Sequence, residues 1–380
     1  MKRNLLLTPG PTQLPPEVCE ALGRPIIHHR TPQFQANLKE AAEGLKYVFQ
    51  TKNDVLILTS SGTGGMEAAV CNLLSPKDQV ITVEGGKFGE RWTELCEAYG
   101  VAAKVIKVKW GQAVTASEIK KILDQEKNIK AVFITLVETS TGVATDIQAV
   151  ADVVRKTQAV LVVDAISGLG AVELQTDNWG VDVVVAGSQK GLMLPPGLAF
   201  ISVSPKAWAL MEKSTNPKYY FDLRGAKKAA EKTDTPFTPA IGIILALNES
   251  LKLMKAAGLE KLFSHYERLA KGTRAAAKAL GLNLLADDSC ISNAVTPIHL
   301  PAGIDGEKLV KVMRDTYGIT VAGGQDELKG KIIRISHMGC LDEYDMLSGI
   351  ACLEKVLNEM GYKFNAGAGV AAAQKFFNTK

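Results

Sequence analysis

The chain has 380 residues, of which 46% are hydrophobic and 22% charged, the balance of a folded globular protein of about two domains. Its 44 basic and 40 acidic side chains leave a net charge of only +4, spread along the chain, so nucleic acid is not an expected partner. No apolar run reaches the roughly 18 residues of a membrane span, and the apolar start at 5–7 is too short for a secretory signal, so we expect a cytoplasmic protein without membrane contact.

Seven apolar, β-branched runs predict strands in the first two-thirds of the chain. Helical patterns lie between most of them, for example 117–126 after a capping threonine and serine, and 147–156. This alternation predicts a mostly parallel, three-layer α/β sheet. The last two runs are joined by a short connection with Pro195-Pro196-Gly197, which predicts a hairpin-like turn. The runs are 54–59, 79–83, 103–108, 131–136, 159–164, 181–186 and 198–203.

The composition changes after Ser204. A turn-rich stretch leads to a predicted helix over 240–257 and to a second one with apolar residues at helical spacing from Leu259. From about Ala294, the order strand, helix, strand, helix predicts a small α+β domain. The Gly/Ala-rich tail from Asn365 is predicted to be frayed or to be an addition to the fold.

Two glycine-containing polar segments follow predicted strands. Ligands bind at the carboxyl ends of the strands in open α/β sheets, so these residues are candidates for a site. Residues 60–67 (SSGTGGME) would present backbone N–H groups and a helix dipole to an anion, with a plain tight turn as the alternative. Residues 138–142 (ETSTG) form a second polar cluster at the same edge.

Asp164 and Lys190 follow two further strands. A carboxylate after four apolar residues is either functional or a helix cap. A lysine closing an apolar strand is costly to bury unless paired or reactive, and burial lowers its pKa, which makes it nucleophilic. Together with an anion cradle, this is the equipment for pyridoxal phosphate: a lysine for the Schiff base, an acid for the pyridine nitrogen and a helix N-terminus for the phosphate. The cysteines and histidines lack ligand spacing, so no metal site is expected.

The chain resembles the class V, fold-type I pyridoxal-phosphate aminotransferases of the alanine–glyoxylate and serine–pyruvate group. The resemblance implies a large three-layer domain with a seven-stranded sheet at 16–258, a small C-terminal domain at 259–364, an N-terminal segment over the active site at 1–15, and a tail at 365–380. The matching segments are 7–12 (LTPGPT), 61–63 (SGT), 87–91 (KFGER), 138–142 (ETSTG), 163–164 (VD), 187–190 (GSQK), 195–197 (PPG), 235–239 (TPFTP) and 334–339 (RISHMG).

The resemblance also implies a set of residues around the cofactor ring. Lys190 would be the Schiff-base and proton-shuttle residue, and Asp164 would keep the pyridine nitrogen protonated. Phe88 occupies a position where many relatives carry a tryptophan stacked on the ring; ordinary packing is the alternative. Thr139 would lie on the side of the ring's phenolic oxygen.

Other residues are implied at the phosphate. Ser61, Gly62 and Thr63 would bind it, with Gln189 beside them. Thr238 resembles the residue that reaches the phosphate from the neighbouring subunit, which implies a homodimer with shared active sites. Its alternative role is to cap the helix that starts at 240.

The implied reaction is a ping-pong transamination from alanine or serine to glyoxylate or pyruvate. Arg334 would hold the substrate carboxylate, unless it is a surface residue on an edge strand, and Gly10 would leave little room beside the substrate. Aspartate, phosphoserine or aminoethylphosphonate as donor stays open, as does a non-enzymatic subunit that retains the fold. A cysteine desulfurase is not expected, because 321–330 contains no cysteine. His28, His29 and Arg30 receive no role.

Overall fold

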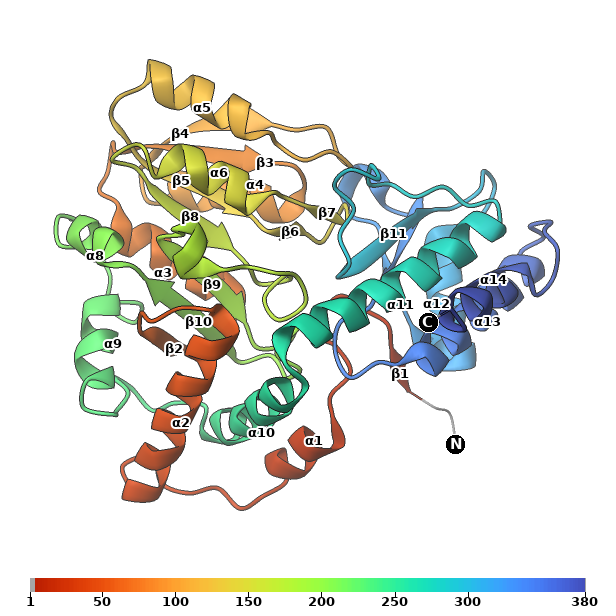
Figure 1. Cartoon of the computed structure of the whole chain (residues 1–380), viewed down its shortest axis with the longest axis horizontal. Coiled ribbons are helices and arrows are strands. Elements are labelled where there is room, and N and C mark those ends of the chain that lie inside the picture. Colours follow the sequence, from red (N-terminus) through yellow and green to blue (C-terminus); the bar gives the residue numbers. More distant parts are fainter. Residues whose placement is uncertain (1–3, 380) are drawn as a thin grey trace.

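A seven-stranded sheet forms the centre of the larger of two domains in the computed structural model, which describes residues 4–379 (Figure 1). The order in space is β2-β10-β9-β8-β5-β3-β4, and every strand pair is parallel except the two that involve β10. The turn before β10 is therefore hairpin-like, as predicted. Each strand overlaps one predicted run: β2 (Val55–Thr59), β3 (Gln79–Glu84), β4 (Ala102–Lys107), β5 (Ile129–Thr135), β8 (Val160–Asp164), β9 (Val183–Gly187) and β10 (Leu198–Val203).

Helices cover both faces of this sheet, which explains why its inner strands are apolar almost throughout. Along β5, Val132 and Ile134 belong to the hydrophobic core on one face, while Ala131 and Phe133 belong to the core on the other. The first core is closed by α1 (Pro16–Leu22), α2 (Pro32–Phe49), α5 (Ala116–Gln125), α6 (Ile147–Val154) and α10 (Ile241–Ala257). The second is closed by α3 (Gly62–Leu73), α4 (Lys87–Ala98), α8 (Pro205–Met211) and α9 (Leu223–Ala230).

Local sequence sets the ends of several of these helices. The capping threonine predicted before the helix at 117 is Thr115: its side chain accepts a hydrogen bond from the Glu118 backbone, and the Glu118 side chain bonds back to the Thr115 N–H. Three short elements complete the large domain: β6 (Val137–Glu138), β7 (Val143–Ala144) and α7 (Thr176–Trp179).

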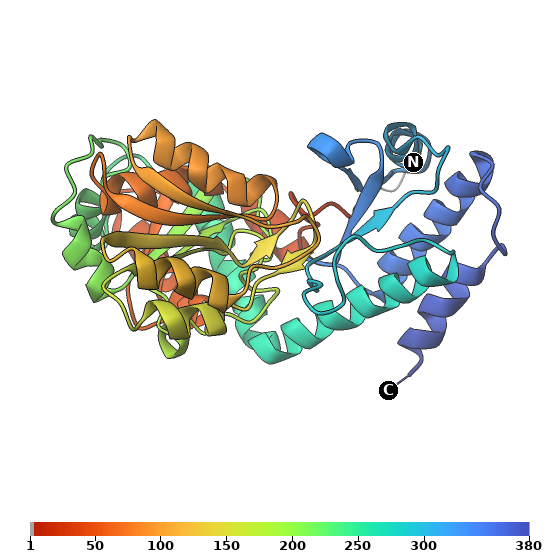
Figure 2. The ribbon, with the colours of Figure 1, turned by 90° about the horizontal axis from the view of Figure 1, so that it is seen from above.

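The smaller domain has a core of its own, built on an antiparallel sheet of order β11-β14-β13. Helix α11 connects the domains, because Leu262 packs against the core of the large domain and Leu269 lies in that of the small one (Figure 2). The domain limits given above remain predictions. The elements are α11 (Leu259–Ala279), β11 (Val295–His299), α12 (Gly306–Tyr317), β12 (Ile319–Thr320), β13 (Ala322–Gly323), the 3-10 helix η1 (Asp326–Leu328), β14 (Ile332–Ser336) and α13 (Glu343–Glu359).

The N-terminal segment lies between the two domains. Its strand β1 (Leu5–Leu6) pairs in parallel with β12, and Leu7 is buried in the small-domain core. Residues 1–3 of the predicted 1–15 segment lie outside the described residues.

The prediction of a frayed tail is wrong, because residues 368–377 form the helix α14 (Ala368–Phe377). Alanine favours helices, and the absence of a side chain at Gly272 on α11 lets the Phe377 ring approach closely. The buried carboxylate of Glu354 accepts hydrogen bonds from the N–H groups of Gly367 and Val370, which satisfies the first turn of the helix. Among residues 4–379, no helix combines the length and the apolar character that crossing a bilayer requires.

Candidate active site

Lys190 and Asp164 meet at the carboxyl edge of the sheet, as the strand pattern predicts. Asp164 is the last residue of β8 and pairs in register with Val185 on β9, whose chain continues to Lys190. Both residues are buried: 3% of the surface of Asp164 and 8% of that of Lys190 is exposed. Burial raises the pKa of Asp164 to about 7. A hydrogen bond from the Ile166 N–H has the opposite effect on this pKa but is the weaker of the two. Burial lowers the pKa of the Lys190 amine to about 8, although the Asp164 charge acts in the opposite direction.

The N-terminal segment holds the backbone of this lysine. Thr12 donates from its N–H to the carbonyl of Gln189 at 3.2 Å and from Oγ1 to the carbonyl of Lys190 at 2.9 Å. A Cβ added to Gly10 would lie 2.4 Å from Cε of Lys190, which is closer than atoms can pack. Gly10 is therefore required for the lysine side chain to lie where it does.

The turn after β2 forms a cradle beside the lysine. Ser61 is the N-cap residue of α3, yet its side chain makes no capping hydrogen bond. A Cβ at Gly62 would collide with the Ile166 side chain at 2.6 Å, so the helix N-terminus and the segment after Asp164 are in close contact. The side-chain oxygen of Gln189 is buried without a hydrogen-bond partner among the described residues, and it lies 3.2 Å from the Cβ position of Gly187.

Phe88 lies over the same space, in the first turn of α4. The Lys190 Nζ is 6.0 Å from the centroid of its ring. Glu138 holds this turn, because its Oε2 accepts hydrogen bonds from the N–H groups of Phe88 at 3.1 Å and Gly89 at 2.8 Å. A buried carboxylate at a helix N-terminus is stabilised by the helix dipole and by these N–H groups. Phe88 thus faces the lysine amine, and its role on the cofactor ring stays a prediction.

Arg334 reaches the site from the small domain. It lies on β14, the central strand of its sheet, and only 7% of its surface is exposed, so the surface alternative is wrong. Its Nε donates to the Gly323 carbonyl at 2.8 Å, and Nη1 donates to the Thr139 carbonyl at 3.2 Å. Burial lowers its pKa to about 10. No carboxylate of residues 4–379 lies within ion-pair distance of this guanidinium, which leaves a buried cation that needs an anion.

Thr139 is held at the same place, because its Oγ1 donates to Ser167 Oγ at 2.6 Å. Thr238, in contrast, is exposed on the loop before α10. The alternative that it caps this helix is wrong, because the N-cap residue is Ala240. In the part of the chain described, its hydroxyl has no hydrogen-bond partner. His28 and His29 stack on each other, and Arg30 pairs with Asp234 at 3.1 Å.

Sequence reasoning did not select three residues that the structure brings to this site. Glu138 appears in the sequence analysis only as part of a polar cluster, and Ser167, three residues after Asp164, was not singled out. Arg91 lies in the segment 87–91, and its Nη1 donates to Thr63 Oγ1 at 3.2 Å. The spacing of three residues between Phe88 and Arg91 places both on one face of a helix, and this signal could have identified the arginine.

These residues fit pyridoxal phosphate. A helix N-terminus with unused hydroxyl and amide groups suits a phosphate, and an amide can turn by 180° to present its NH₂ group. A buried carboxylate and a buried amine suit the two reactive positions of the ring, and the aromatic side chain suits its face. Residues 4–379 contain no group of three or more His, Cys, Asp or Glu arranged as a metal site.

Comparisons with known proteins agree over nearly the full length. The family described as Aminotransferase class-V matches residues 5–340. The chain is 47% identical over 381 residues to the "Soluble hydrogenase, small subunit" of Synechococcus sp., with 99% of each chain covered. It is 39% identical over 381 residues to L-aspartate–glyoxylate aminotransferase of Paracoccus denitrificans, with 99% of this chain and 96% of that protein covered. The crystal structure of ureidoglycine–glyoxylate aminotransferase from Bacillus subtilis matches with a TM-score of 0.96 at 30% identity, covering 100% of this chain and 99% of that one.

Proposed function

The chain belongs to the class-V aminotransferases, which use pyridoxal phosphate to move an amino group between an amino acid and a 2-oxo acid, and on that premise we propose that its donor is alanine or serine and its acceptor glyoxylate or pyruvate. One observation carries the proposal: buried Lys190 and Asp164 share a site with the guanidinium of Arg334, which has no acidic partner among residues 4–379. Glyoxylate as acceptor is supported by the names of two of the relatives above.

Lys190 and Asp164 move and hold the protons. Bound pyridoxal phosphate supplies a carbonyl carbon for the amino group and a ring that takes up the electron pair released at Cα. Because burial brings the pKa of Lys190 to about 8, a useful fraction of its amine is neutral near physiological pH and can remove the Cα proton of the donor. In the second half-reaction, the same Nζ returns a proton to Cα of the acceptor-derived product. Asp164 would hold a proton on the ring nitrogen, because a positive ring nitrogen beside it favours the ionised carboxylate and opposes the rise in pKa that burial causes.

Arg334 orients the substrate. Its Nε and one N–H of Nη1 bond backbone carbonyls, so the remaining N–H groups of Nη1 and Nη2 are available to a carboxylate. The two carbonyl contacts fix the guanidinium plane before substrate arrives, which reduces the entropic cost of binding. Both substrates carry a carboxylate next to the reacting carbon, so one arginine serves both half-reactions.

We also propose a cytoplasmic homodimer in which each subunit completes the other's site through Thr238. Its exposed and unpartnered hydroxyl supports this, as do the free cysteines among the described residues for a reducing compartment. Mixing Lys190→Ala and Thr238→Ala subunits tests the sharing. Hybrid dimers contain one site with both native residues, so transaminase activity and cofactor affinity should recover on mixing. No recovery in hybrids whose formation is verified would contradict shared sites.

Two alternatives have a specific observation behind them. The Paracoccus relative is named for aspartate, so an aspartate donor is the first. The Synechococcus relative is named as a hydrogenase subunit, which favours a non-enzymatic subunit that retained the fold. The presence of Lys190, Asp164 and Arg334 in one buried site supports the transaminase.

An absorbance experiment decides between these functions. The protein is loaded with pyridoxal phosphate, and alanine, serine or aspartate is added one at a time. We expect the band of the lysine-bound cofactor to bleach with alanine or serine and to return with glyoxylate or pyruvate. Bleaching by aspartate alone would establish the first alternative. No band after loading would contradict the transaminase and favour the second.

A further inference from the structure

Arg91 contacts the predicted phosphate end of the site. It lies on α4, one turn after Phe88, and its Cζ is 5.1 Å from the centroid of the Phe88 ring. Its Nη1 donates to Thr63 Oγ1 at 3.2 Å, so the guanidinium lies against the first turn of α3. The charge of Arg91 lowers the pKa of both Lys190 and Asp164, which agrees with its facing the same space.

Among residues 4–379, this guanidinium has no acidic partner, because no carboxylate lies within ion-pair distance of Arg91. The acids around it are engaged elsewhere: Glu90 pairs with Lys87 at 2.6 Å, and Glu138 accepts from backbone N–H groups. A partly buried cation without a counter-charge indicates that an anion is bound there when the protein works.

Two arginines of the site therefore have no acidic partner among residues 4–379, and they bond different segments of the chain. Arg334 bonds the carbonyl of Thr139, on the small-domain side, where the substrate carboxylate is proposed to bind. Arg91 bonds Thr63, in the turn proposed to hold the phosphate. Transamination brings two anionic groups into the site, a substrate carboxylate and a cofactor phosphate, and the two arginines match them.

The contact with Thr63 also sets the direction of a hydrogen bond. A guanidinium has only donors, so the Thr63 hydroxyl must act as the acceptor from Arg91. The proton of that hydroxyl is then free, and within the described residues it has no other acceptor. It can be donated to an anion bound at the N-terminus of α3.

We propose that Arg91 is a phosphate-recognition residue, which balances the charge of the cofactor phosphate and holds the Thr63 hydroxyl as a donor toward it. This inference rests on the proposed phosphate site at 61–63. It assigns Arg91 to cofactor binding and positioning, and it leaves proton transfer to Lys190.

The test compares pyridoxal phosphate with pyridoxal, which lacks the phosphate. Dissociation constants of both compounds for the apo protein are measured by equilibrium dialysis, for the native chain, Arg91→Gln and Arg91→Lys. We expect Arg91→Gln to weaken pyridoxal phosphate about 10- to 100-fold and to leave pyridoxal within about twofold, because pyridoxal has no phosphate for Arg91 to contact. Arg91→Lys keeps the charge without the fork of donors and should fall between the two.

Lys87→Gln is the matched control. It removes one positive charge from the same helix turn, but this charge is already paired with Glu90 and Asp326, so affinity for pyridoxal phosphate should stay within about twofold. Thermal unfolding of each apo variant checks that the fold is retained.

Two outcomes would overturn the inference. One is unchanged affinity of Arg91→Gln for pyridoxal phosphate, and the other is an equal loss for pyridoxal. If the unchanged affinity is accompanied by a raised KM for aspartate but not for alanine, Arg91 is assigned to a substrate side-chain carboxylate instead. Failure of the native chain to bind pyridoxal phosphate would instead contradict the proposed function, so the two failures are distinguishable.

Discussion

Thr12 Oγ1 donates a hydrogen bond to the backbone carbonyl of Lys190 at 2.9 Å, across 178 residues of sequence. The hydroxyl is buried, and Thr12 also donates from its N–H to the Gln189 carbonyl. The N-terminal segment is thus part of the wall around the reactive amine. Since β1 of the same segment pairs with β12 of the small domain, this wall joins both domains at the site.

A methyl group at position 10 should displace the lysine. In Gly10→Ala, the new Cβ would lie 2.4 Å from Lys190 Cε and 2.5 Å from Nζ. Either the side chain or the N-terminal segment must move, so we expect a loss of at least about tenfold in kcat/KM, because small misplacements at a reacting group are costly. Gly242→Ala is the control, since a Cβ there meets nothing within 4 Å. Equal activity of the two variants would contradict this steric role.

The pKa of Lys190 should be visible in the pH dependence of cofactor binding. Covalent binding requires the neutral amine of Lys190. With a pKa of about 8, the neutral fraction of this amine rises about fivefold from pH 7 to pH 8 and levels off above pH 9. The rate at which the apo protein binds pyridoxal phosphate, followed by visible absorbance, should show this profile.

Asp164→Asn provides the comparison for the pH profile. The negative charge of Asp164 raises the pKa of Lys190, so its removal should move the midpoint to lower pH. A rate that keeps rising to pH 10 in the native protein would show an unperturbed lysine and contradict the assignment.

Arg334→Gln should impair substrates and spare the cofactor. The charged contacts to a carboxylate contribute about 2–4 kcal/mol, which corresponds to about 30- to 1000-fold in kcat/KM for the amino donor. The dissociation constant of pyridoxal phosphate should change by less than about threefold, since the hydrogen bonds of Arg334 go to Gly323 and Thr139 and not to the turn at 61–63. An unchanged KM for every amino donor would remove this role.

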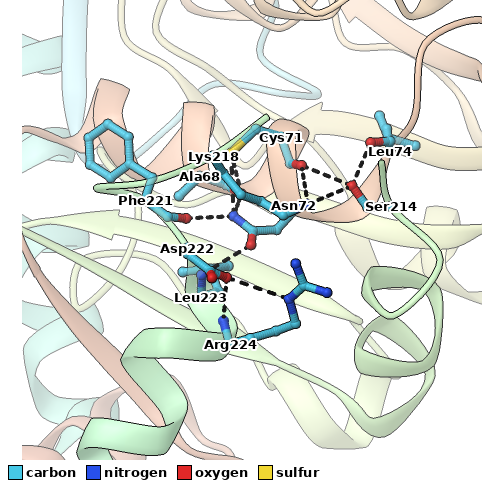
Figure 3. A network of polar contacts seen from close by, with 10 residues as sticks. All are labelled: Ala68, Cys71, Asn72, Leu74, Ser214, Lys218, Phe221, Asp222, Leu223 and Arg224. Carbon is cyan, nitrogen blue, oxygen red and sulfur yellow. Dashed lines mark hydrogen bonds and ion pairs between the residues drawn. The ribbon is translucent and has the colours of Figure 1, made fainter. Parts of the chain in front are cut away.

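Asn72 should be important for stability, because it ties the end of α3 to the loop before α9 (Figure 3). It is 1% exposed; its Nδ2 donates to the carbonyls of Ala68 and Phe221, and its Oδ1 accepts from the Leu223 N–H. Asn72→Leu leaves buried backbone groups unpaired and should lower the free energy of unfolding by about 3 kcal/mol. The exposed Asn178→Leu should change it by less than about 0.5 kcal/mol, as measured by urea unfolding. Equal effects would show that the contacts of Asn72 contribute little.

The position of the site at one sheet edge followed from sequence pattern alone. Apolar runs separated by helical patterns predict parallel strands, and parallel strands bring their carboxyl ends to the same edge. Asp164 and Lys190 could therefore be placed together without coordinates. The prediction of a frayed tail is wrong because glycine and alanine content does not by itself indicate flexibility: the helix of the tail is stabilised by Glu354 and by packing on α11.

The sequence by itself determined the layered α/β architecture, the carboxyl-edge site and, through the resemblance of its motifs, the family. Only the tertiary structure decided that Arg334 is buried beside Thr139, that Arg91 lies against Thr63, and that Gly10 touches Lys190. The physical reason is that strand order and helix periodicity are local properties, repeated every two to four residues. Contacts between residues far apart in the chain depend on how whole elements pack, and no local pattern encodes that packing.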